Sequence, residues 1–144
     1  MDDYERYEAE CKMIRKTNER LLSEFEVWLK SSGLSKNTIE KHLSNIDFYV
    51  SEYLLYEDAT EAKDSVNAVG MFLGYWFIKK ARWANQSNIK GNATSLRKFY
   101  TFMYEKDLIE NEDLVDLKET IKEGMPEWLA TLDRYDDPSV EDVW

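Results

Sequence analysis

The stretch that decides the fold is SKNTIEKHLSNIDFYVSEY, residues 35–53. Its apolar side chains recur every three or four residues, which is the spacing of one face of an α-helix. These side chains are Ile39, Leu43, Ile46, Val50 and Tyr53. Ser35 is a good N-cap, because its hydroxyl can accept a hydrogen bond from a free N–H of the first turn. The spacing predicts a helix that runs to about Leu55.

Helical spacing continues on both sides of this stretch. Before it, one apolar stripe predicts either a single helix over about residues 3–31 or two shorter ones, and Gly33 suits the left-handed position that ends a helix. After it, apolar stripes predict helices over about 66–80 and 89–104. A short stripe over 114–121 stops at Gly124, and Pro126 suits the first turn of another short helix. The chain is therefore expected to be all-α.

Composition limits what this helical protein can be. The chain has 144 residues, the size of one ordinary domain, and 43% of them are hydrophobic. One cysteine, Cys11, and one histidine, His42, exclude an internal disulfide framework and clustered-histidine metal sites. We expect no cofactor. No apolar run reaches the ~20 residues of a membrane span, and the acidic N-terminus lacks a signal-peptide pattern. We therefore expect a cytoplasmic protein without membrane contact.

Details of the third predicted helix concern its start and its packing. Asp64 or Ser65 is expected to cap it. Gly70 and Gly74 lie four residues apart, on one face of a helix. In a chain with charged flanks, this spacing predicts close packing against a neighbouring helix of the core.

Charge is distributed unevenly along the chain. The net charge is −10, which by itself opposes binding to the phosphates of nucleic acid. Residues 65–104 nevertheless contain no Asp or Glu and six cations, whereas residues 105–144 contain fourteen acids against four cations. The six cations are Lys79, Lys80, Arg82, Lys90, Arg97 and Lys98. The sequence thus combines a basic middle with an acidic C-terminal part.

Two groups of motifs resemble one family. The first is LSEFEVWL, residues 22–29, followed by GLSKNTI, residues 33–39, and the helix to Tyr53. The second is SLRKFYTFMY, residues 95–104, followed by DLIEN, residues 107–111. Together they resemble the core-binding domain of tyrosine recombinases, the phage integrases and their relatives. The family has Asn-Pro at the end of this domain, whereas here Glu112 follows Asn111, so the exit departs from the family pattern.

The resemblance implies a fold and a division of the chain. The fold is a small bundle of about four helices, of the sterile-alpha-motif-like kind. Residues 20–112 would form the core-binding helical domain, 1–19 a helical extension, and 113–144 an acidic helical tail. The catalytic domain of the family supplies Arg, Lys, His and a nucleophilic Tyr. The residues after Asn111 contain no His and few cations to stabilise a phosphoryl-transfer transition state, so we expect no enzyme activity.

In the family, the core-binding domain clamps duplex DNA with the turn into its second helix and with its fourth helix. The matching residues are expected to contact DNA. They are Lys36, Asn37, Thr38, Lys41, His42, Lys90, Asn92, Thr94, Arg97 and Lys98. Lys and Arg at phosphates release counterions, and Asn and Thr can bond phosphates or base edges. Lys90, Thr94, Arg97 and Lys98 share a polar helix face.

Other interpretations remain open from the sequence. A polar helix face such as that of Lys90, Arg97 and Lys98 is often only solvated. His42 suits a partly buried place in a bundle instead of a DNA contact. Cations at a helix C-terminus interact favourably with the helix dipole, which would explain Lys79, Lys80 and Arg82 without a ligand. Trp83 fits a core or lid position as well as base stacking. The alternative function is a protein-interaction or self-association module, with DNA binding lost, whose acidic part docks a basic partner or another copy of the chain. The partners considered are double-stranded DNA, a recombinase catalytic chain or a second copy. In a combined hypothesis, residues 113–144 fold over the basic face and mask it.

Overall fold

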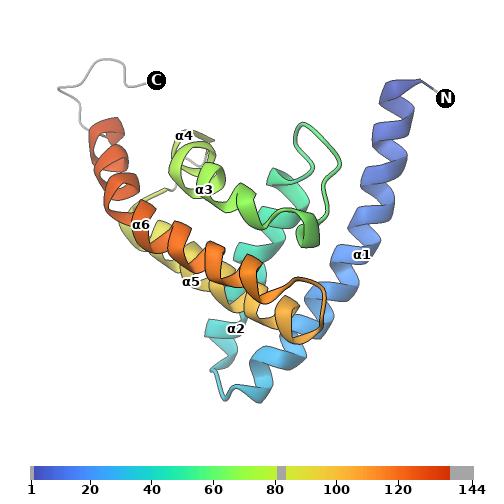
Figure 1. Cartoon of the computed structure of the whole chain (residues 1–144), viewed down its shortest axis with the longest axis horizontal. Helices are drawn as coiled ribbons and strands as arrows, with labels where there is room; N and C mark the ends of the chain where they lie inside the picture. The colour runs from blue at the N-terminus through green and yellow to red at the C-terminus, as the bar shows by residue number, and fades with distance from the viewer. Residues whose placement is uncertain (1, 81–83, 137–144) are drawn as a thin grey trace.

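The computed structural model describes residues 2–80 and 84–136, and within them it contains helices and loops but no strand (Figure 1). This confirms the all-α prediction. The first helix, α1, spans Asp3–Ser31 without interruption. Asp2 caps it by accepting a hydrogen bond from the N–H of Glu5, and Gly33, with φ +77°, follows its end as expected. One long helix forms because the apolar stripe stays in phase along the whole segment.

The decisive stretch forms α2, Lys36–Asp47, which runs on into one π-helical segment, η1, Phe48–Tyr53. Ser35 caps α2 through the N–H of Thr38, as predicted. Ile39, Ile46 and Val50 are buried. Tyr49 and Val50, adjacent in η1, are both buried.

The third predicted helix is irregular. It consists of short segments named η2, Ala62–Asp64; η3, Val66–Ala68; α3, Val69–Met71; η4, Phe72–Trp76; and α4, Phe77–Lys80. The expected cap is wrong, because neither η2 nor η3 has a side-chain cap and the Ser65 hydroxyl donates to the carbonyl of Glu61. The Val66–Lys80 run still buries Val69, Phe72 and Phe77.

Helix α5 spans Gln86–Glu105, and α6 spans Asn111–Asp136. Asn85 caps α5 through the N–H of Asn88. The expectation of two short C-terminal helices is wrong, since α6 passes through Pro126 as one helix. Proline costs one backbone hydrogen bond, but Pro126 is exposed, so water can reach the carbonyl left free. Buried residues on both sides, Ile121 and Leu132, hold α6 to the same core.

Close packing of η4 against α6 rests on Gly74, as the spacing predicted, whereas Gly70 lies on α3 and would keep an ordinary contact. A Cβ on Gly70 would lie 3.4 Å from Cγ2 of Thr120. A Cβ on Gly74 would lie 2.6 Å from Cδ1 of Trp128, and one on Gly124 would lie 2.5 Å from Cε2 of the same indole. The Trp128 ring therefore occupies the space that two glycines leave free, one on each helix.

Two buried tyrosines tie the helices to the irregular segment. The Tyr49 hydroxyl donates to the carbonyl of Ser65, and the Tyr100 hydroxyl donates to that of Ala62. Both rings are fully buried, and burial raises the pKa of both hydroxyls. Because each buried hydroxyl is satisfied by a backbone carbonyl, these bonds hold the loop around η2 against the core.

The N-terminal half of α1 projects from the bundle (Figure 1). It packs through a small separate apolar cluster in which Cys11 and Ile14 contact Leu55. The hydroxyl of Tyr7 donates to the carbonyl of Leu55. Cys11 is a free, buried thiol, so it serves packing on the helix stripe, as expected.

Candidate nucleic-acid interface

The contact between α2 and α5 contains one buried polar network, centred on the Ser95 hydroxyl. This hydroxyl donates to the carbonyl of Gly91 at 3.0 Å and accepts from the amide of Asn45 at 3.0 Å. Nδ1 of His42 lies 2.7 Å from the same oxygen. A serine hydroxyl has one donor and two acceptor sites, so the network is complete when His42 donates from Nδ1 as a neutral ring.

The structure excludes two of the expected DNA contacts from the surface. His42 is 7% exposed, and its pKa is lowered by burial and by the nearby charge of Lys98. Asn92 is 2% exposed, and its amide donates to the carbonyl of Asn88. The assignment of these two residues as DNA contacts is therefore wrong. Asn92 lies two residues after Lys90, about 200° around the helix, and this rotation carries it into the core.

A neutral buried His42 makes stability depend on pH. The unfolded chain keeps the ordinary pKa of 6.5, whereas the folded chain holds the ring at a lower pKa. The unfolded state therefore binds a proton first as the pH falls, and the folded state loses stability. We expect the urea midpoint to drop between pH 7.5 and 5.5. His42→Asn, which offers an amide in place of Nδ1, should show a smaller drop. An equal drop in both proteins would contradict a role for His42.

The cations of α5 lie on its solvent side. Lys90 is exposed, and Arg97 and Lys98 are partly exposed. The Arg97 guanidinium donates to the Thr94 hydroxyl at 3.2 Å, and that hydroxyl donates to the carbonyl of Lys90 at 3.1 Å. Among the described residues, none of these three cations makes an ion pair with a carboxylate within 4.0 Å. Their charges are thus left uncompensated at short range.

The turn into α2 contributes fewer residues to the candidate DNA-binding surface than expected. Lys41 is exposed and lies one turn from Asn45, on the flank of α2 that meets α5. Lys36 lies elsewhere, beside a surface hollow that Glu26 and Glu40 also line. The Thr38 hydroxyl accepts a bond from Ser35 in the helix cap. Asn37 is exposed in the first turn of α2.

Helix α6 adds two lysines that sequence reasoning missed. The Gln86 amide contacts the Asp133 carboxylate at 3.3 Å, which identifies the flanks of α5 and α6 that face each other. Helical periodicity places Lys118 and Lys122 on the same flank of α6 as Asp133, and Lys90 and Arg97 on the same flank of α5 as Gln86. The signal was their spacing of four, which a sum of charges over the segment concealed. Together the cations on these flanks of α2, α5 and α6 form the basic face, which consists of Lys41, Lys90, Arg97, Lys98, Lys118 and Lys122.

The acids of α6 form a separate ridge. Periodicity puts them on the exposed side of the helix, about a third of a turn from Lys118 and Lys122. This acidic ridge consists of Glu112, Asp116, Glu119, Glu123 and Glu127. Among the side chains described up to Arg134, no ion pair joins it to the cations of α5, so this part of the chain lends no support to masking of the basic face. Residues 137–144 lie outside the described part of the chain.

The six cations of residues 65–104 do not all share one face. Lys79 lies over the ring of Tyr75, with its Nζ 5.4 Å from the ring centre, on the irregular third helix. Arg82, Trp83 and the side chain of Lys80 lie outside the described residues. Three of the six, on α5, belong to the basic face, and helices α2 and α6 supply its other members. The basic face is therefore built by tertiary packing rather than by one segment.

These observations define the class of protein: an all-α bundle with a basic face on three packed helices. No protein-family model matches the chain, and no curated protein or solved structure matches it. No helix among the described residues has the length and apolar character to cross a membrane. In the same part of the chain, no group of three His, Cys, Asp or Glu side chains is placed to hold a metal ion.

Proposed function

We propose that this protein is a non-catalytic module that binds double-stranded DNA through its basic face. The observation that carries the proposal is the gathering of cations from α2, α5 and α6 on one side of a bundle, where those on α5 make no ion pair with any described carboxylate. Lysine and arginine side chains in such a group can neutralise several phosphates of one duplex and release their counterions.

The resemblance of residues 20–112 to recombinase core-binding domains supports the same proposal. In that family the fourth helix and the turn before the second helix contact DNA. The corresponding elements here are α5 and the start of α2, and Lys41, Thr94, Arg97 and Lys98 lie where these helices meet solvent. In this proposal the protein serves DNA recombination by binding, and a separate catalytic chain would cut the strands.

A second candidate function follows from the acidic ridge of α6. Its five carboxylates are exposed on the side of α6 that faces away from α5. Their combined negative charge would attract a basic protein. The basic face of a second copy carries the complementary charge, so self-association is the simplest form of this alternative. Under this alternative the chain would self-associate at low salt, and labelled duplex would not bind to it.

The experiment that tests DNA binding is a salt titration. Fluorescence anisotropy of a labelled duplex is measured with the full chain between 50 and 200 mM salt. If all six cations of the basic face contact phosphates, affinity should fall about a thousandfold over this range, and about fortyfold if only the three on α5 do. Absence of binding at 50 mM salt, or binding that ignores salt, would overturn the proposal.

A further inference from the structure

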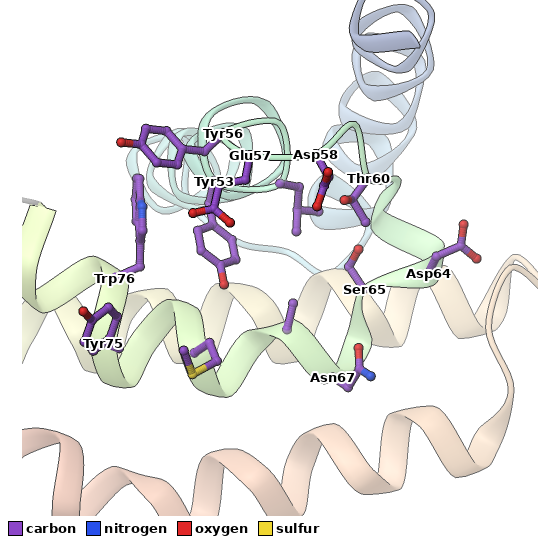
Figure 2. A pocket seen from close by; sticks show the side chains of 13 residues that line it. Tyr53, Tyr56, Glu57, Asp58, Thr60, Asp64, Ser65, Asn67, Tyr75 and Trp76 are labelled. Atoms are coloured by element: carbon purple, nitrogen blue, oxygen red, sulfur yellow. The ribbon is translucent and has the colours of Figure 1, made fainter. Parts of the chain in front are cut away.

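A cavity of about 320 Å³ lies between the end of η1 and the start of the irregular third helix, in a region separate from the basic face (Figure 2). Its walls come from the loop after η1 and from the segment that includes η3, α3 and η4. The residues that line it are Tyr53, Leu54, Tyr56, Glu57, Asp58, Thr60, Asp64, Ser65, Asn67, Ala68, Met71, Tyr75 and Trp76. This volume suits a ligand or side-chain head of a few non-hydrogen atoms.

Aromatic rings form one end of this cavity. Trp76 lies edge-to-face with Tyr53, their ring centres 5.2 Å apart, and with Tyr56 at 5.9 Å. Figure 2 shows Trp76 rising from its ribbon toward Tyr56, with Tyr75 on the same ribbon. Ring faces carry a negative electrostatic potential, so adjacent Tyr and Trp rings attract a cation.

Carboxylates surround the rest of the cavity. Glu57, Asp58 and Asp64 line it, and no Lys, Arg or His does so among the described residues. Glu57 is close enough to Tyr53 that, after burial, its charge is the second cause that raises the pKa of that hydroxyl. Lys63, the cation nearest in sequence to this wall, pairs with Glu61 at 3.5 Å. The lining thus combines three negative charges with four aromatic rings.

One cation already uses a ring at the edge of this site. Nζ of Lys79 lies 5.4 Å from the centre of the Tyr75 ring and 3.4 Å from its hydroxyl. This contact is an intramolecular example of the interaction that the cavity can make with a ligand.

We propose that this cavity binds an organic ammonium group, either a free alkylammonium compound or the side chain of a lysine in a partner. The aromatic rings would contact the methyl or methylene groups next to the nitrogen, and Glu57 and Asp58 would balance the charge. An inorganic cation gains little here, because it would need oxygen ligands around it in place of rings. The inference is independent of DNA binding, since the basic face and the cavity share no residue.

The test compares a charged probe with its neutral isostere. Choline and 3,3-dimethyl-1-butanol have the same shape, and binding of each to the full chain is followed by tryptophan fluorescence and by NMR shifts. We expect choline to bind at least about tenfold more tightly, because only the cation gains from the rings and carboxylates. Equal binding of the two, or no saturable binding of choline, would overturn the proposal.

A second arm identifies the source of the ammonium group. Blocked lysine, Nα-acetyl-lysine methylamide, and its trimethylated form are titrated beside choline. Tighter binding of a blocked lysine supports a partner side chain, and tighter binding of choline supports a free compound. Either result supports the site, provided that the neutral isostere binds more weakly.

Substitutions of residues that line the cavity test whether choline binds there. Glu57→Gln is expected to weaken choline binding about threefold, and Tyr56→Leu about threefold to tenfold through loss of a ring face. The matched control is Glu52→Gln, which removes the same charge from an exposed position that does not line the cavity. Circular dichroism verifies that each variant folds. An effect of Glu52→Gln equal to that of Glu57→Gln would contradict binding in the cavity.

Discussion

Gly74→Ala is expected to destabilise the protein by about 1–3 kcal/mol, as overpacked core substitutions do. A methyl group at this position would overlap the indole of Trp128, whose Cδ1 lies 2.6 Å from the added carbon. The backbone of Gly124 borders the same indole, since a Cβ built on it would lie 2.5 Å from Cε2, so the ring has little room to move. The clash therefore has to move η4 away from α6 or push Trp128 out of the interface. Urea unfolding of the variant and the parent protein measures the effect.

In the matched control, a glycine-to-alanine substitution is expected to raise the stability of the protein. Gly91 lies inside α5, and an added Cβ there meets no atom within 4 Å. Gly91→Ala should therefore stabilise the protein by up to about 1 kcal/mol through helix propensity alone. In a Trp128→Ala background, Gly74→Ala should lose its penalty, and the double-mutant cycle measures the coupling. Equal stabilisation by both glycine substitutions would show that Trp128 does not occupy this space.

Neutralising the α5 cations is expected to produce the largest effect on binding. The variant Lys90→Gln, Arg97→Gln, Lys98→Gln should lose about 10²–10³-fold in duplex affinity at about 0.1 M salt, since each phosphate contact contributes close to tenfold there. The slope of log affinity against log salt should fall by about three. Anisotropy with the labelled duplex measures both quantities.

The α1 helix offers a control with the same chemistry. Lys12, Arg15 and Lys16 are exposed in the N-terminal half of α1, the half of the helix that projects from the bundle (Figure 1). Changing these three residues to Gln removes two lysines and one arginine, as the α5 variant does, and therefore changes the net charge by the same amount. We expect little loss of affinity. An equal loss would mean that binding follows only total charge, which would contradict an interface on α5.

The contribution of α6 is tested by substitution rather than by truncation. Leu117 and Ile121 lie in the main core, so removing the residues after Asn111 would expose the bundle interior. Lys118→Gln with Lys122→Gln keeps the core and removes two members of the basic face. A loss of affinity places α6 at the duplex, and no loss limits the interface to α2 and α5. Glu119→Gln with Glu123→Gln removes charge from the acidic ridge and is expected to strengthen DNA binding.

Local features of this protein could be predicted from the sequence alone. Ser35 caps α2 and Gly33 adopts a positive φ because these positions depend on hydrogen bonds and backbone angles of nearby residues. The stripe Ile89, Ala93, Leu96, Tyr100 and Met103 is buried as expected, because helical periodicity is itself local. The all-α class and most of the helix boundaries follow from such signals.

Long-range packing decided the rest. Pro126 was expected to begin a helix, but α6 passes through it because the buried residues Ile121 and Leu132 hold both halves to one core. Asn92 is an exception: it follows Ile89 by three residues and precedes Leu96 by four, so helical periodicity alone places it on the buried face. The basic face joins lysines from α2, α5 and α6, and the aromatic cavity joins Tyr53 to Trp76. Contacts between distant segments depend on how whole helices pack, and periodicity within one helix carries no information about its partners.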